Sequence, residues 1–204
     1  QAIGKIPVSS YLTDRVDFAT FSGHKFHAVR GVGFVYKKAG KKITPLLTGG
    51  GQEKDFRSTT ENVAGIASMA KALRLVTDKE EFSLPKIAKM KKIIFDELAK
   101  YQDITIFSGE GEDFAPNILT FGIKGVRGEV IVHAFEEHQI YISTTSACSS
   151  KAGKPAGTLI SMGVPTKLAQ TAVRISLDDD NDMGQVEQFL TIFKQVYAKT
   201  QKVR

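Results

Sequence analysis

Three side chains in this sequence have the chemistry to bind or attack a small substrate: Lys25, Cys148 and Arg174. Lys25 ends the turn Ser-Gly-His-Lys at residues 22–25, directly after an apolar stretch and before Phe26. Burial lowers the pKa of a lysine, and the neutral amine can then form a Schiff base with an aldehyde. From the residues alone an ordinary solvated surface lysine is favoured, with a lysine shielded from bulk water by this turn as the alternative.

Cys148 is the single cysteine of the sequence, in a segment where six of the eight residues 143–150 are serine or threonine. A run of hydroxyls is a poor site for burial, and Lys151 and Lys154 follow closely, so a reactive thiolate on an exposed loop is favoured over a small buried hydrophobe. One cysteine excludes an internal disulfide and a zinc site built from several thiolates. It also indicates a reducing, cytoplasmic setting.

Arg174 lies inside the apolar, strand-like run at residues 172–177. An unpaired charge in such a place is costly, so this guanidinium needs a partner. Two interpretations remain open from the residues alone. One is an ion pair that is purely structural, and the other is a fork that holds a substrate carboxylate through two hydrogen bonds.

Other kinds of site are disfavoured. The four histidines have no cysteine near them, so no metal site is predicted, and the glycines at 49–51 lack the Gly-Lys-Ser/Thr of a phosphate-binding loop. The net charge is +6 and the pI about 9.3, with basic clusters at 37–42, 86–92 and 194–204. Without an aromatic-rich motif among them, solvated faces and frayed ends are favoured over a surface that attracts an acidic protein or RNA, and we expect no direct nucleic-acid binding. No apolar run approaches the roughly 18 residues of a membrane span, so no membrane association is expected.

The elements that must position these residues follow from apolar periodicity. Alternation predicts strands over 16–21, 31–36, 104–107, 117–121, 139–142 and 172–177. Helical spacing predicts helices over 61–77, 84–101, 129–138 and 181–202, with Thr59 or Thr60 capping the first and Ser83 the second. Strands that alternate with helices indicate an α/β or α+β fold. We expect a domain boundary between the two long helices, which gives domains 1–75 and 76–204.

Together these segments resemble the pyridoxal-phosphate cysteine desulfurases of the NifS/IscS type, in the class V aminotransferase family. The matching segments occur in the family's order and cover essentially the whole chain. They are Ser-Gly-His-Lys-Phe-His at 22–27, Gly-Val-Gly at 31–33, Gly-Gly-Gly-Gln-Glu at 49–53, Arg-Ser-Thr-Thr-Glu-Asn at 57–62, Ala-Pro-Asn-Ile-Leu at 115–119, Ser-Thr-Thr-Ser-Ala-Cys-Ser at 143–149 and Val-Arg-Ile-Ser at 173–176.

The resemblance implies roles for the residues of the first domain. Lys25 matches the lysine that binds the cofactor, pyridoxal 5'-phosphate, covalently. Ser22 and His24 match groups beside it, with Ser22 on the cofactor phosphate, and Gln1 matches a glutamine that bonds the ring hydroxyl. Thr60 matches a threonine that reaches the phosphate of the neighbouring subunit, which implies a homodimer.

For the second domain, the resemblance implies that Cys148 is the nucleophile on a mobile loop. It would take sulfur from L-cysteine as a persulfide and leave L-alanine, while Arg174 binds the substrate carboxylate. The sulfur would pass to an acceptor protein in iron–sulfur cluster assembly, thiamine synthesis or tRNA thiolation. Selenocysteine lyase or another class V lyase is the alternative within the family. A non-catalytic, basic RNA- or protein-binding module is the alternative outside it.

The implied fold class is α/β: the end of a pyridoxal-phosphate transferase large domain, followed by a small α+β C-terminal domain. The chain would correspond to the C-terminal half of such an enzyme. We therefore expect it to be inactive without the N-terminal half.

Overall fold

The structure is a computed structural model that describes residues 2–111, 113–144 and 157–202. The chain divides into two compact units, Gln1–Ser83 (unit 1) and Leu84–Arg204 (unit 2). The helix α1, Val63–Leu98, runs through this boundary. Among the described residues, no helix is both long and apolar enough to cross a membrane.

The two helices predicted over 61–77 and 84–101 are wrong as separate elements, because α1 is continuous with Pro85 inside it. Ser83 is therefore a buried residue within the helix and not a cap. Proline removes one backbone donor from the helical ladder, at a cost of about 3 kcal/mol or more. Burial of the apolar side chains that follow it compensates, since Ile87 and Met90 are fully buried.

Unit 1 is built on a two-stranded antiparallel sheet of β1 (Phe18–Ser22) and β2 (Gly33–Lys37), with Phe21 opposite Phe34. Their rings stack at 4.7 Å between centroids. Short 3-10 turns at η1 (Val8–Tyr11), η2 (Gly23–Phe26) and η3 (Gln52–Asp55) complete the unit with the start of α1. Its small core consists of Ile3, Phe26, Ala28 and Ala72. The strands predicted over 16–21 and 31–36 are confirmed within two residues.

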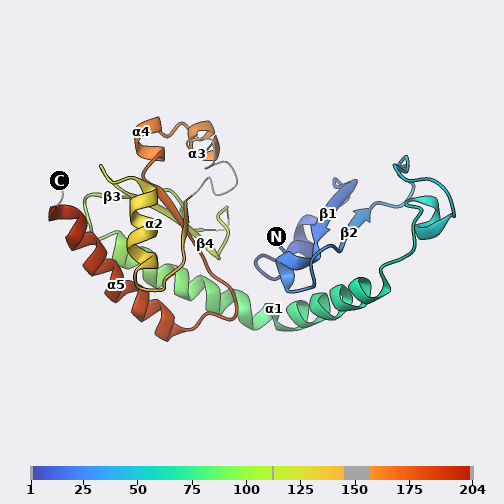
Figure 1. Ribbon diagram of the computed structural model, residues 1–204, viewed down its shortest axis with the longest axis horizontal. Coiled ribbons are helices and arrows are strands. Elements are labelled where there is room, and N and C mark those ends of the chain that lie inside the picture. The colour runs from blue at the N-terminus through green and yellow to red at the C-terminus, as the bar shows by residue number, and fades with distance from the viewer. Residues whose placement is uncertain (1, 112, 145–156, 203–204) are drawn as a thin grey trace. The chain divides into compact units, whose positions relative to one another are not determined.

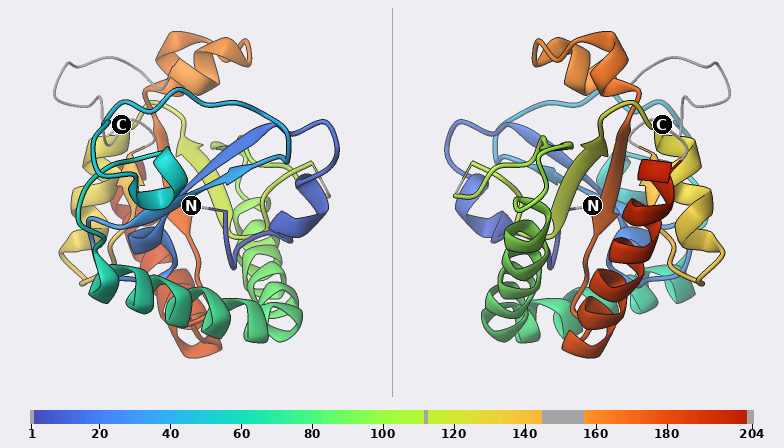
Figure 2. Two further views of the ribbon diagram at one scale, coloured as in Figure 1. Left: turned by 90° about the vertical axis from the view of Figure 1, so that its right-hand side faces the viewer. Right: turned by 90° about the vertical axis from the view of Figure 1, so that its left-hand side faces the viewer.

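Unit 2 contains a four-stranded antiparallel sheet in the order β3-β4-β6-β5. The strands are β3 (Ile104–Ile106), β4 (Ile118–Ile123), β5 (Ser143–Thr144) and β6 (Ala172–Ser176). The second half of α1, α2 (Gly128–Glu136) and α5 (Met183–Lys202) pack on this sheet (Figure 1). The short helices α3 (Gly157–Ser161) and α4 (Thr166–Ala169) lie at one end of the sheet (Figure 2).

One large core joins the sheet to these helices. Alternate residues of β4 and β6 supply the sheet side, and α1, α2 and α5 supply the other. The fully buried members are Ile87, Met90, Leu98, Leu119, Phe121, Ile123, Ile131, Phe135, Val173 and Phe193. Because side chains alternate along a strand, the residues between them, such as Thr120 and Arg174, project from the opposite face of the sheet.

The strand predicted over 139–142 is wrong, because these residues are not in a strand and β5, as far as the chain is described, consists of Ser143–Thr144. Local bonding at the end of α2 explains the difference. Gln139 has a left-handed backbone (φ 58°), and the N–H of Ile140 donates to the carbonyl of Phe135. Residues 139–140 are therefore engaged in closing the end of α2. The other predicted strands and helices of unit 2 appear with small shifts, while α3 and α4 were not predicted.

Lys91 is an unexpected buried cation on α1. Its ammonium donates to the carbonyls of Gly109 at 3.2 Å and Ala115 at 3.0 Å, which fixes the loop that leads into β4. Burial lowers the pKa of Lys91, and the carboxylate of Glu110 offsets part of that effect.

We predict that Lys91→Met destabilises the chain, because two loop carbonyls lose their donor. The expected loss in the free energy of unfolding is about 1–3 kcal/mol, measured by urea denaturation. Lys89→Met is the matched control, since Lys89 is exposed on the same helix. Equal effects of the two substitutions would show that the buried contacts contribute nothing.

Glu97 ties α1 to α5 electrostatically. Its carboxylate lies 2.6 Å from the ammonium of Lys100 and 3.4 Å from that of Lys194. The hydrogen bond from Lys100 is the largest of the effects that lower the pKa of Glu97 below its usual 4.5. The carboxylate therefore stabilises the fold above pH 4.5, and this contribution is lost as the pH falls through the lowered pKa.

We predict that Glu97→Gln reduces the free energy of unfolding at pH 7 by a few tenths to about 1 kcal/mol, as for other ion pairs near the surface. The difference from the unmodified chain should vanish well below pH 4.5, when both chains are neutral at this position. Urea unfolding at the two pH values measures it, with the exposed Glu187→Gln as the control. A deficit that persists unchanged in acid would contradict the electrostatic origin.

Candidate functional site

The turn η2 in unit 1 presents Ser22, His24 and Lys25 at the surface. It directly follows β1, and the N–H of Gly23 donates to the carbonyl of Val32 at 2.9 Å. A β-carbon on Gly23 would lie 3.0 Å from that same oxygen, so the turn is tight enough to favour glycine. The ring of Phe26 is fully buried below it. One buried ring thus anchors a turn whose three polar side chains are exposed.

Lys25 matches the solvated surface lysine of the sequence analysis and not the shielded one. Its side chain is exposed, so the residues described here do not shield the amine from water. The sequence argument placed Lys25 beside buried Phe26, but consecutive residues of a short turn point in different directions. Burial of one therefore says little about burial of the next.

The other cofactor-binding residues implied by the resemblance are not all placed. Gln1 lies outside the described residues. Thr60 is exposed in the segment between η3 and α1. This segment is held by the N–H of Ser58, which donates to the carbonyl of Leu47 at 3.0 Å. Within the described chain, no hydrogen bond links Thr60 to the η2 turn.

Arg174 occupies the central position of a polar row in unit 2. It lies on β6, directly opposite Thr120 of β4 on one side and Ser143 of β5 on the other. The residue is half-buried, and its Nε is enclosed without a hydrogen-bond partner. Across the part of the chain that the structure describes, no carboxylate forms an ion pair with Arg174. Of the two interpretations left open by the sequence, the structural ion pair is therefore not supported.

Cys148 lies outside the described residues. Its position in the sequence can still be related to the sheet, because β5 ends at Thr144. Thr144 pairs with Val173, the neighbour of Arg174 on β6. Thr144, the last described residue before Cys148, is thus paired one residue from the arginine.

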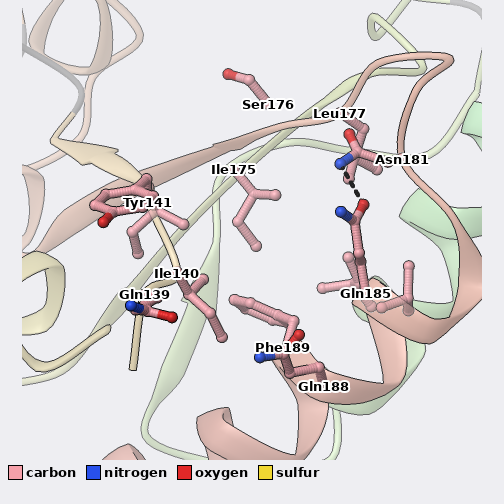
Figure 3. A pocket seen from close by; sticks show the side chains of 13 residues that line it. Gln139, Ile140, Tyr141, Ile175, Ser176, Leu177, Asn181, Gln185, Gln188 and Phe189 are labelled. Atoms are coloured by element: carbon pink, nitrogen blue, oxygen red, sulfur yellow. Dashed lines mark hydrogen bonds between the residues drawn. The ribbon is translucent and has the colours of Figure 1, made fainter. Parts of the chain in front are cut away.

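A separate pocket of about 280 Å³ in unit 2 contains none of the predicted site residues. Figure 3 shows Tyr141 and Gln139 on one side of it and Asn181 and Gln185 on the other. The Asn181 amide donates to Gln185 at 2.8 Å. Ile175 is among the residues that line the pocket, and it alternates with Arg174 along β6. The two side chains therefore project to opposite faces of the sheet.

Sequence reasoning missed this pocket because its lining comes from three separate segments, none of which carries a reactive group. It also missed Thr120 and Ser143 as neighbours of Arg174. A hydroxyl inside a predicted apolar strand is the signal that could have indicated Thr120. Its pairing partner depends on strand order and register, which the pattern does not reveal.

The comparison with known families decides the relationship of the chain. The family model described as aminotransferase class-V matches residues 1–189. The chain belongs to the class-V aminotransferase family. This confirms the resemblance and the α/β fold class predicted from the sequence.

Relatives in the class-V family point to one subgroup. The chain is 46% identical over 203 residues to a NifS/IcsS protein homolog of Lactobacillus delbrueckii subsp. bulgaricus, covering 100% of this chain and 53% of that protein. It is 33% identical over 200 residues to cysteine desulfurase 1 of Trichormus variabilis, covering 98% of this chain and 50% of the relative. The chain thus spans about half the length of the curated relatives it matches.

Solved structures of class-V proteins agree. A NifS-like protein superposes with a TM-score of 0.82 at 33% identity, covering 97% of this chain and 50% of the other. A NifS-like protein from Rickettsia africae also gives 0.82, at 32% identity, with 97% and 52% covered. Both units of this chain therefore have counterparts in the NifS-like fold.

Proposed function

We propose that this chain is part of a pyridoxal-phosphate cysteine desulfurase, which takes the sulfur of L-cysteine and leaves L-alanine. The observation that carries the proposal is Arg174, a half-buried arginine with an enclosed Nε and no partner among the described residues. Such a group suits a ligand with a carboxylate, because a planar fork donates two parallel hydrogen bonds to it. The relatives named cysteine desulfurase supply the reaction class.

The donor set of the η2 turn fits pyridoxal 5'-phosphate. Lys25 offers an amine for the cofactor's aldehyde, Ser22 a hydroxyl for its phosphate, and His24 an imidazole beside them, all exposed on one turn. Gln1 and Thr60 would add contacts to the ring hydroxyl and to a phosphate of the neighbouring subunit. When bound, the cofactor supplies an electron sink for bonds at the α-carbon of an amino acid.

Arg174 would hold the substrate carboxylate, so that the carbon–sulfur bond has one orientation. Cys148 as thiolate would attack the sulfur of the bound cysteine. A sulfur–sulfur bond forms, the carbon–sulfur bond breaks with its electron pair on carbon, and that carbon takes a proton and leaves as alanine. Cys148 follows Thr144 by four residues, which span at most about 14 Å. Attachment of its segment beside Arg174 supports a reach of this order.

The wider arrangement is also a proposal. We expect a homodimer in the cytoplasm that passes the persulfide sulfur to an acceptor protein, in iron–sulfur cluster assembly, thiamine synthesis or tRNA thiolation. Segments corresponding to the other half of the relatives' length would enclose Lys25, which is exposed in this chain. By itself the chain would then be inactive, so alanine release and kinetics with L-cysteine are measured on the chain completed by those segments.

Cys148→Ser should abolish persulfide formation and alanine release from L-cysteine in the protein, while the visible absorbance of the bound cofactor stays. The reason is that a hydroxyl does not take up sulfur as a thiolate does. Alanine and sulfide assays measure the loss, and the absorbance spectrum controls for folding. Undiminished alanine release would contradict the proposed nucleophile.

Arg174→Gln should raise the KM for L-cysteine about tenfold to a hundredfold, because a charge-assisted fork to the carboxylate is lost. Steady-state kinetics measure the change. Arg127→Gln is the control, since Arg127 is exposed and pairs with Glu129 on the surface. If the two variants had the same KM, Arg174 would not hold the substrate.

A further inference from the structure

We infer that Thr120 and Ser143 complete a carboxylate-binding row with Arg174, and that their hydroxyls help to set the affinity for the substrate. These three residues form the carboxylate row. The assignment of this carboxylate to an amino acid rests on the proposed function. The inference that the row binds a carboxylate rests on the strand pairing of the sheet alone.

The register of the sheet places the three residues side by side. Arg174 pairs with Thr120 on β4 and with Ser143 on β5. Directly opposed residues of antiparallel strands have β-carbons about 4.5–5.5 Å apart and project to the same face. Both hydroxyls therefore flank the arginine, one from each neighbouring strand.

Thr120 has its backbone bonded and its hydroxyl available. Its N–H donates to the hydroxyl of Ser108 at 2.8 Å, and its carbonyl accepts from the N–H of Phe107 at 2.8 Å. These bonds fix the position of the residue, which is only 8% exposed. In the described part of the chain, its hydroxyl forms no hydrogen bond. Ser143 is half-buried and likewise shows no bond from its hydroxyl there.

The balance of donors favours a carboxylate. One permanent positive charge with a planar fork matches a single negative charge shared by two oxygens, and a hydroxyl on either side can donate to those same oxygens. Polar groups that are withdrawn from water without partners destabilise a fold. Of the three residues, the Nε of Arg174 is in that state among the described residues, and a bound carboxylate could accept hydrogen bonds from all three.

The surroundings limit the size of the ligand. Ala172 projects from the same face as Arg174, two residues earlier on β6, and it is buried with Leu159 of α3 and Ala169 of α4. The row is thus closed at that end of the strand. A short carboxylate that enters from the other end fits this arrangement better than a long chain.

Acetate is the probe for the test, because it carries a carboxylate but no amine that reacts with an aldehyde. Binding to the protein is followed by the NMR signal of the enclosed Arg174 Nε–H. Thr120→Val and Ser143→Ala should each weaken acetate binding about fivefold, the usual effect of one lost hydrogen bond. Thr120→Ser, which keeps the hydroxyl, should bind like the unmodified protein.

Thr105→Val is the matched control, because Thr105 is a hydroxyl residue of the same sheet on β3, opposite Gly122 and away from β6. Its acetate affinity should stay within twofold of the unmodified value. In kinetics with L-cysteine, Thr120→Val should raise KM by a similar factor and leave kcat within twofold. A purely structural role would lower kcat and the melting temperature instead.

Acetate affinities that are equal in the unmodified protein, Thr120→Val and Ser143→Ala would overturn the inference, as would no acetate binding by the unmodified protein. If the variants weaken acetate binding as expected but the protein releases no alanine from L-cysteine, the carboxylate row stands. In that case the result contradicts only the proposed function.

Discussion

An arginine held between two strands, whose Nε is enclosed without a hydrogen-bond partner among the described residues, is the constraint on which unit 2 depends. Leaving a buried donor unsatisfied costs about 1–3 kcal/mol, so the surrounding structure must hold Arg174 in place against that penalty. The large core on the other face of the sheet provides the support, through side chains such as Phe121 and Val173 that alternate with the polar row. A sheet with one fully packed face can hold an unsatisfied polar group on the other face.

Strand β5 of the same sheet precedes the proposed nucleophile, Cys148, in the sequence. Among the described residues β5 pairs with β6 at Ser143 and Thr144, and Cys148 follows Thr144 by four residues in the sequence. Proximity between Arg174 and Thr144 thus follows from register.

Unit 1 has a different balance of forces. Its core is small, with four buried residues that include Phe26. A two-stranded sheet has only marginal stability without further packing. The exposed amine of Lys25 and exposed apolar side chains such as Leu46, at 94%, belong to this unit. Relatives about twice as long have additional chain with which such surfaces can pack. The unit nevertheless keeps the η2 turn intact, because Gly23 and Phe26 fix it locally.

Local patterns in the sequence were sufficient for the family, the fold class and most elements. The reason is that alternation, helical spacing and short motifs around Lys25, Cys148 and Arg174 depend on neighbours along the chain. The continuous helix through Pro85, the lost strand at 139–142 and the exposure of Lys25 were decided by tertiary structure. So was the pairing of Arg174 with Thr120 and Ser143. The continuous helix and the pairing of Arg174 depend on residues far apart in sequence, where the energy of burial and of strand register outweighs local preference. The absence of a strand at 139–142 follows instead from the backbone bonds that close α2, and the exposure of Lys25 from the direction of its side chain on the η2 turn.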